Sequence, residues 1–327
     1  GSIRRQRQMC IRDSSSIFGG SYGWASAGRF HHAQSQLHRF LNCIGGYTRS
    51  KFTYSFAAAE AMVPHILGSY RAYLDTCTSW DSIEENTELF VCFGGVPLKN
   101  GQIAQGGTGS HNQKEKLISS AKAGIRFVNL SPLKSDLLDE VKGKWLPLRP
   151  NTDVAIMLGI AHTLYKENLY SEIFIKKYTE GFDIFLPYLL GDLDGVVKDA
   201  NWASEISEIS SDEIISLARD MSSKRTMISV SWSLTRQDHG EQPFWAAIML
   251  ASMLGQIGLP GGGFGFGYSA TNHIGGQFSI IPGAAFPQSD NKIDNFIPVA
   301  RISDLLLNPG ETFHFDGKEY EYPDIKL

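Results

Sequence analysis

The sequence predicts an α/β fold class: a Rossmann-like parallel sheet with helices on both faces, flanked by a second α/β region from the two ends of the chain. Two observations support this. Short apolar runs, ended by glycine, proline or serine, occur at residues 88–95, 125–132 and 225–234, and helical patterns separate them. In such sheets ligands bind beyond the carboxyl ends of the strands.

The composition is that of a globular protein with a substantial core. Of its 327 residues, 42% are hydrophobic and 20% are charged, and the net charge is −4. No basic block suggests nucleic acid as a partner, and no run approaches the ~18 apolar residues that a membrane span needs. The four cysteines include no C-x-x-C pair, so the sequence favours free thiols over a disulfide framework or an iron–sulfur cluster.

Both ends of the chain differ from ordinary domain edges. Residues 1–14 are basic, polar and aperiodic and lack the apolar core of a secretion signal, so we expect a non-native scar. Residues 320–327 stop after a proline turn and an apolar pair, as a strand would begin. We expect an internal fragment, with residues 83–239 as the cofactor-binding domain and residues 15–82 and 240–327 as parts of one discontinuous α/β domain.

The first elements are predicted to be helices. Residues 29–46 show apolar side chains at helical spacing and end at paired glycines, which suit a left-handed stop. Residues 53–70 are alanine-rich and are predicted to be helical until Pro64, with Ser55 at the N-cap position.

Between and after the apolar runs, the pattern predicts four further helices. They cover residues 114–124, 153–168, 210–224 and the stretch from 244, and the second is capped by Thr152 or Asp153. The last helix is followed by residues 258–267, which are glycine-rich and predicted to be a loop. Beyond them the periodicity is weak.

Polar side chains follow each apolar run, where the carboxyl ends of parallel strands would meet. Backbone N–H groups and a few cations at such an edge suit a phosphate-bearing ligand. Neither G-x-G-x-x-G nor a P-loop is present, so an ordinary NAD site is not supported. The residues alone indicate a dinucleotide-like ligand with unassigned chemistry, and the side chains concerned are Lys99, Asn100, Ser131, Trp232, Ser233 and Arg236.

Taken singly, each of these residues has a structural alternative. Ser55 alone reads as a helix cap, and Lys99 as a solvated turn lysine. Arg236 could pair with a carboxylate such as Asp238 or Glu241. The aromatic residues in "GGSYGW" (residues 19–24) could form a packing corner, and the histidines at 31, 32 and 38 lack the further ligands of a zinc site.

Several long segments, in the right order from residue 17 to the end, resemble the dimethyl sulfoxide / trimethylamine N-oxide / biotin sulfoxide reductase family of molybdenum enzymes. The first of them is closest to the biotin sulfoxide reductase branch. These segments are "IFGGSYGWASAGRFHHAQSQLHRFLN", "TYS" with "VPHILG", "PNTDVAIMLGIAHTL", "YTEGFDIFLPYLLG", "SKRTM", "WSLTRQDHGEQ" and "ASMLGQIGLPGGGFG".

The resemblance implies a cofactor, molybdenum held by two molybdopterin guanine dinucleotides, bis(molybdopterin guanine dinucleotide). Ser55 of "TYS" matches the serine that ligates the metal. Trp24 matches the tryptophan whose indole N–H donates to the oxo group, and Tyr22 a tyrosine that reaches the same oxygen, so both are candidate catalytic residues. The residues that match cofactor contacts are Trp24, Lys99, Asn100, Leu130, Ser131, Pro150, Asn151, Thr152, Trp232, Ser233 and Arg236.

Two positions depart from the family pattern. Leu-Ser-Pro at residues 130–132 replaces an Ile-Asp-Pro of several relatives, which removes a carboxylate beside the expected ribose or guanine. "YSFAA" at residues 54–58 replaces "YSTGA" or "YSSGA", so the turn after Ser55 is bulkier. The resemblance also implies that amino- and carboxyl-terminal family domains lie outside this chain, and that the chain alone is inactive.

The implied function is two-electron oxygen-atom transfer, as a reductase of S-oxides or N-oxides: biotin, methionine or dimethyl sulfoxide, or trimethylamine N-oxide. Electrons would come from an external donor, whether a cytochrome, a quinol-linked protein or a flavin or thiol reductant. The alternatives are a non-catalytic relative or a fragment like formate dehydrogenase or nitrate reductase, which Ser55 disfavours. The bacterial compartment, periplasm or cytoplasm, stays open.

Overall fold

The computed structural model describes residues 13–20, 32–101, 103, 108–279 and 287–326. The chain divides into two compact units. Unit 1 takes residues 1–54, 105–108 and 279–327, and unit 2 takes residues 55–104 and 109–278. These compact units differ from the expected bounds, because residues 55–82 and 240–278 belong to the unit that holds the large sheet.

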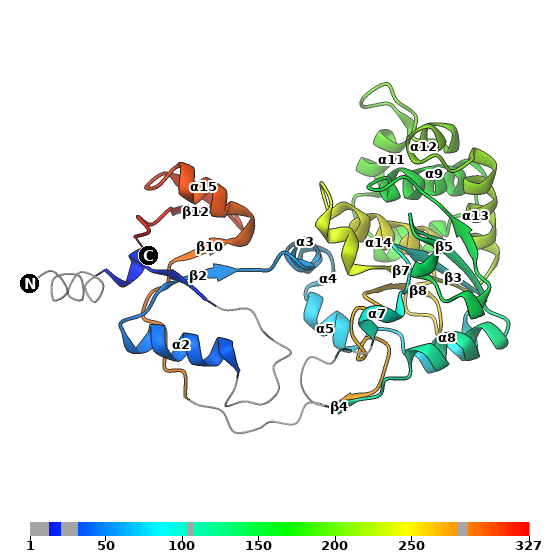
Figure 1. Cartoon of the computed structure of the whole chain (residues 1–327). Helices are drawn as coiled ribbons and strands as arrows, with labels where there is room; N and C mark the ends of the chain where they lie inside the picture. The colour runs from blue at the N-terminus through cyan, green and yellow to red at the C-terminus, as the bar shows by residue number, and fades with distance from the viewer. Residues whose placement is uncertain (1–12, 21–31, 102, 104–107, 280–286, 327) are drawn as a thin grey trace, which may run out of the picture. The chain divides into compact units, whose positions relative to one another are not determined.

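Unit 2 is built on a five-stranded parallel sheet with the order β6-β5-β3-β7-β8 (Figure 1). The three predicted apolar runs form its central strands, β5 (Arg126–Leu130), β3 (Leu89–Phe93) and β7 (Thr226–Val230). Every residue of β3 and β7 is buried, which explains their continuous apolar character. The third run ends earlier than expected, because Ser231 turns the chain into the short 3-10 helix η4 (Trp232–Arg236) by accepting from the Ser233 N–H.

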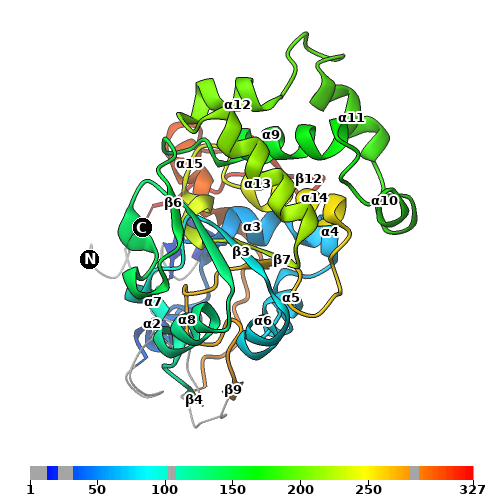
Figure 2. The same cartoon turned by 90° about the vertical axis from the view of Figure 1, so that its right-hand side faces the viewer.

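Helices cover both faces of this sheet, as the sequence predicts (Figure 2). On one face lie α9 (Asp153–Lys166), α12 (Ala200–Ser207), α13 (Ser211–Ser223) and α14 (Gln242–Leu254). On the other lie α6 (Trp80–Asn86) and α8 (Gln113–Lys122). The Ser210 hydroxyl caps α13 by accepting from the Glu213 N–H at 3.3 Å, which agrees with the predicted serine start.

The glycine-rich segment contains a strand that the sequence analysis assigned to a loop. β8 (Gly263–Phe266) pairs in parallel with β7, with Val230 opposite Phe266. Glycine disfavours strands in general, yet a Cβ on Gly265 would lie 2.1 Å from the Tyr268 ring. The expected loop was therefore wrong here, since glycine is needed for close packing. The short edge strand β6 (Lys144–Leu146) was not predicted either.

Smaller elements complete unit 2. The predicted helix before Pro64 is α3 (Ala57–Met62), and Pro64 begins a second helix, as suits its missing N–H. The others are α4 (Pro64–Leu67), α5 (Tyr70–Asp75), α7 (Leu98–Gly101), η2 (Lys134–Asp136), η3 (Asp139–Val141), α10 (Glu172–Tyr178) and α11 (Phe182–Leu190). The two-residue strands β4 (Thr108–Gly109) and β9 (Phe278–Ser279) lie at the limits of the unit.

Unit 1 is the second α/β region, and it is formed from the two ends of the chain as expected. Its parallel sheet joins β1 (Phe18–Gly19), β2 (Thr48–Lys51) and β10 (Phe296–Pro298). The predicted first helix is α2 (Ala33–Cys43), followed by Gly45 and Gly46 at positive φ. The remaining elements are η1 (Ser14–Ser16), η5 (Val299–Arg301), α15 (Ile302–Leu307) and the hairpin of β11 (Thr312–Phe315) with β12 (Lys318–Glu321).

Most of the segment expected to be non-native lies outside the described residues. Its last two residues are described, and Asp13 accepts from Lys326 Nζ at 2.8 Å. This hydrogen bond and that from Ser15 hold the pKa of Asp13 below its usual value. In the part of the chain that the structure describes, no helix is both long and apolar enough to cross a membrane.

Candidate functional site

The carboxyl ends of the strands in unit 2 meet at one edge, which we call the carboxyl edge. Phe93 of β3 stands opposite both Leu130 of β5 and Val230 of β7, so these three strands end in register. The loops that follow them carry most of the predicted site residues. The register therefore brings these loops together, as the parallel arrangement requires.

The first loop turns through two glycines and leads into α7, which holds Lys99 and Asn100. Gly95 has a φ of +73°, and a Cβ there would lie 2.5 Å from Asp136. Glycine thus lets this turn approach the loop after β5. Lys99 Nζ lies 3.5 Å from Asp136 Oδ1, yet the Lys99 side chain is 66% exposed, so solvent screens this ion pair and the ammonium group stays accessible.

The second loop is closed by its own hydrogen bonds. Leu130 and Ser131 are both buried, and the Ser131 hydroxyl donates to Asp136 Oδ2 at 2.7 Å. Trp145 Nε1 donates to the Ser131 carbonyl at 2.8 Å. Sequence reasoning missed Asp136, because no motif marks it and only the fold brings it to Ser131. A carboxylate is therefore present at this edge, although residue 131 itself is a serine.

The segment before α9 carries Pro150, Asn151 and Thr152. Asn151 has a φ of +66°, and Thr152 is the N-cap residue, as expected for one of the two candidates. Its hydroxyl donates to the Arg149 carbonyl at 2.5 Å instead of capping α9. Asp153 follows in a buried position, and burial raises its pKa to about 6.

The third loop is η4, which combines a buried ring with exposed polar groups. Trp232 is buried, and a Cβ on Gly267 would lie 2.1 Å from its Nε1, so glycine makes room for the indole. Ser233 and Arg236 are exposed. The Ser233 hydroxyl donates to Ser231 Oγ at 2.9 Å.

The structure corrects one structural alternative for Arg236. Among the described residues, no carboxylate lies within ion-pair distance of its guanidinium, and Asp238 and Glu241 approach His239 instead, at 4.0 and 3.8 Å. Arg236 Nη1 donates to the Ser55 carbonyl at 2.9 Å. A backbone carbonyl does not neutralise a cation, so Arg236 can also bind an anion.

Ser55 is the first residue of unit 2 and lies two residues before α3. Ser55 does not occupy the expected N-cap position: the N-cap residue is Phe56, whose side chain makes no capping hydrogen bond. Ser55 instead contacts η4 through its carbonyl. The structure thus brings the candidate metal ligand to Arg236, and Lys99 to Ser131 through Asp136. Tyr22 and Trp24 lie outside the described residues.

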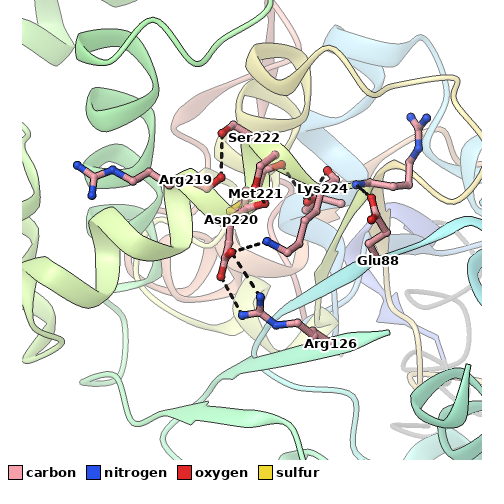
Figure 3. Close-up of polar contacts among 10 residues, drawn as sticks. Glu88, Arg126, Arg219, Asp220, Met221, Ser222 and Lys224 are labelled. Carbon is pink, nitrogen blue, oxygen red and sulfur yellow. Dashed lines mark hydrogen bonds and ion pairs between the residues drawn. The ribbon is translucent and has the colours of Figure 1, made fainter. Parts of the chain in front are cut away.

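The opposite edge of the sheet, the amino edge, has a different character (Figure 3). Asp220 of α13 accepts from Arg126 at 2.8 and 3.4 Å and from Lys224 at 2.5 Å. The Glu88 carboxylate accepts from the Arg225 N–H at 2.7 Å. Two surface hollows of about 440 and 630 Å³ lie here, away from the predicted site residues, and one is lined by Asp220 and Arg219. At this edge Asp220 thus pairs with both Arg126 and Lys224.

Comparison with known proteins finds similar sequences over nearly the whole chain. The sequence profile described as molybdopterin oxidoreductase matches residues 2–314. A biotin sulfoxide reductase of Cereibacter sphaeroides is 45% identical over 327 residues, all of this chain and 44% of that protein. A dimethyl sulfoxide/trimethylamine N-oxide reductase of the same organism is 40% identical, over 95% of this chain and 39% of that protein.

Two further similarities were found. A trimethylamine-N-oxide reductase of Haemophilus influenzae is 41% identical, over 97% of this chain and 40% of that protein. The chain thus spans less than half the length of the curated relatives it matches. Among solved structures, the acetylene hydratase of Pelobacter acetylenicus aligns with a TM-score of 0.48 and 19% identity, covering 79% of this chain and 32% of that one.

Proposed function

The chain belongs to the molybdopterin oxidoreductase family, and from this premise we propose that it is part of a molybdenum-dependent reductase that transfers oxygen from S-oxides or N-oxides. The substrate classes follow from the relatives, which are named biotin sulfoxide, dimethyl sulfoxide and trimethylamine-N-oxide reductases. The activity belongs to the whole protein that contains this chain.

One observation supports this proposal most strongly: Arg236, a cation without a carboxylate partner among the described residues, donates to the residue expected to ligate molybdenum. An anionic dinucleotide that carries a metal is held by cations that bind its phosphate and by a protein ligand to its metal. The exposed Lys99 adds a second positive charge at the same edge. The chemistry of this donor set fits a phosphate-bearing molybdenum cofactor.

In this proposal the cofactor is bis(molybdopterin guanine dinucleotide), and Ser55 is the metal ligand. The fragment supplies no iron–sulfur cluster, and the electron donor is an external protein or reductant. The residues proposed to hold the pterin dinucleotides are Trp24, Lys99, Asn100, Leu130, Ser131, Pro150, Asn151, Thr152, Trp232, Ser233 and Arg236.

When bound, this cofactor supplies two-electron oxygen-atom transfer, and the protein orients it and the substrate. The Ser55 oxygen, as a hard alkoxide, suits a high-valent metal. We propose that the Trp24 indole N–H and the Tyr22 hydroxyl donate hydrogen bonds to the substrate oxygen. Donors placed where negative charge develops in the transition state lower the barrier to bond cleavage. Arg236 and Lys99 bind phosphate, and Ser233 adds a hydroxyl donor.

The test is elemental analysis of the whole protein, produced with molybdate in the medium. We expect molybdenum in the parent and its loss, together with turnover of S-oxides and N-oxides, in Ser55→Ala. Ser252→Ala is a matched control, because Ser252 is a buried serine whose hydroxyl donates to the Ile248 carbonyl within α14. A parent protein without molybdenum contradicts the proposed function. A Ser55→Ala variant with parental metal spectra and turnover removes Ser55 from the site.

A further inference from the structure

The Ser55 carbonyl receives hydrogen bonds from two residues of η4. Thr235 Oγ1 lies 3.0 Å from it and Arg236 Nη1 lies 2.9 Å from it. Ser55 and Thr235 are 180 residues apart in the sequence, so these contacts are tertiary and not part of a local turn. They fix the peptide that follows the Ser55 side chain.

The next residue is held by the same element. The Phe56 ring stacks on the Trp232 indole, with centroids 4.3 Å apart and an angle of 23° between the planes. Trp232 is buried at the start of η4, so its ring offers a fixed surface. Aromatic pairs with this geometry stabilise beyond the area that they bury. The bulkier turn "YSFAA" therefore gains a contact that a small residue at position 56 could not make.

Thr235 is itself held in place. It is 8% exposed, and its hydroxyl also donates to the Trp232 carbonyl at 2.7 Å, so one proton is shared between two carbonyls. The backbone of Gly240 packs closely over it, since a Cβ there would lie 2.1 Å from the Thr235 carbonyl oxygen. The donor that reaches Ser55 thus belongs to a compact turn.

We propose that η4 sets the direction of the Ser55 side chain by holding the Ser55 carbonyl and the Phe56 ring, which makes Thr235 and Phe56 positioning residues for the metal ligand. With the backbone fixed, only the χ1 rotamers of the serine remain to be chosen. Arg236, which donates to the same carbonyl, links the binding of phosphate to the placement of Ser55. The role of Ser55 as metal ligand rests on the proposed function, whereas the contact of η4 with Ser55 and Phe56 is tested separately.

The first experiment measures amide hydrogen exchange in the whole protein prepared without molybdenum. The reporters are the N–H groups of Ala59 and Glu60, which donate to the Phe56 carbonyl in the first turn of α3. Thr235→Val keeps the side-chain shape but removes the donor, and we expect about fivefold faster exchange, as loss of one hydrogen bond predicts. Thr235→Ser should restore the parental rate.

Thr163→Val is the matched control. Thr163 is a buried threonine whose hydroxyl donates to the Gly159 carbonyl at 2.9 Å in α9, so the same hydroxyl is lost in a different place. In Thr163→Val the N–H groups of Ala59 and Glu60 should exchange at the parental rate. If Thr235→Val fails to fold, Phe56→Leu replaces it, because this change removes the ring stack and keeps the Thr235 and Arg236 donors. Parental exchange in the variant used overturns the inference.

The second experiment records the electron paramagnetic resonance of the pentavalent metal in the loaded protein. We expect Thr235→Val to shift the spectrum, Thr235→Ser to restore it, and Thr163→Val to leave it as in the parent. A parental spectrum in both Thr235→Val and Phe56→Leu overturns the positioning role. If the parent contains no molybdenum, the proposed function fails, and the exchange experiment still decides whether η4 docks Ser55.

Discussion

The two edges of the large sheet use charge in opposite ways. At the amino edge, Asp220 binds Arg126 and Lys224, and Glu167 binds Arg219 through two hydrogen bonds of 2.7 and 2.8 Å. At the carboxyl edge, the guanidinium of Arg236 donates to a backbone carbonyl, and Lys99 is largely exposed. Three cations at the amino edge thus pair with carboxylates, while Arg236 at the carboxyl edge has no carboxylate partner among the described residues.

From this difference we expect variants at one edge to affect stability and variants at the other to affect binding. The pairs at the amino edge all join residues of unit 2, so truncating them should affect unfolding alone. The exposed cations at the carboxyl edge are expected to contribute little to folding, because solvent screens the Lys99–Asp136 pair and Arg236 has no carboxylate partner among the described residues. Variants at the two edges should therefore move different observables, and four of them test this in order of expected effect.

The largest effect is expected for Arg236→Ala at the carboxyl edge. Loss of a charged hydrogen-bond donor costs about 1.5–3 kcal/mol, so cofactor binding should weaken roughly tenfold to hundredfold. The measurement is the molybdenum that remains with the whole protein after gel filtration. Full retention would show that the exposed cation does not serve the ligand.

Asp153→Asn should come next, as a gain of stability. Burial raises the Asp153 pKa from 3.8 to about 6, so ionisation opposes folding as the pH rises through this interval. Above pH 6 the cost of ionising Asp153 on folding is about 3 kcal/mol. The interaction of its negative charge with the N-terminal end of the α9 dipole offsets up to about 1 kcal/mol, so the variant should gain about 2 kcal/mol of stability. The penalty disappears as the pH falls below 3.8, because Asp153 is then protonated in both the folded and the unfolded protein.

Urea unfolding at pH 7 and pH 4 measures this effect. Asp212→Asn is its control, because Asp212 is an exposed carboxylate in the first turn of α13. It lacks the burial that makes Asp153 costly. A gain for Asp153→Asn that is equal at both pH values would show that ionisation is not its cause.

Asp220→Asn tests the amino edge. Burial alone would raise the Asp220 pKa, but hydrogen bonds from Lys224 and Arg126 hold it below its usual value of 3.8. The two partly exposed pairs together are worth about 1 kcal/mol. Stability should fall by this amount above pH 4 and converge with the parent as the pH drops below that value, with molybdenum content unchanged throughout.

Arg219→Ala should have the smallest effect. Its guanidinium pairs with Glu167 but is 60% exposed, so solvent screens the pair. We expect a parental unfolding midpoint and parental molybdenum content. The variant removes the same side chain as Arg236→Ala, from the other edge. Equal loss of molybdenum in both would erase the distinction between the edges.

Much of the fold could be predicted from local pattern. The three central strands and the helices α8, α9, α13 and α14 follow from apolar runs, periodicity and stop signals. The strand β8 could not, because its glycines serve packing against the Tyr268 ring, a contact that the sequence does not display. Hydrophobic periodicity and residue propensity describe a segment in isolation, whereas β8 forms because of its packing against the rest of the unit.

The candidate site was predicted only in part, for the same reason. The loops after β3, β5 and β7 were placed at one edge by the parallel topology, and the register agrees. Asp136 was missed, and the cap expected of Ser55 was wrong, since both depend on contacts that only the folded chain creates. The roles of Tyr22 and Trp24 stay predictions.

The 180-residue separation between Ser55 and Thr235 has a consequence for the order of folding. Contacts between distant segments close large loops, and the entropy of closure is offset only when the intervening structure has formed. Because η4 directly follows β7, the segment around Ser55 is expected to reach its final conformation after β7 has joined the sheet. Pulsed hydrogen exchange during refolding would show this as late protection of Ala59 relative to the β7 amides. In that order, the large sheet forms before Ser55, the proposed metal ligand, reaches its final position.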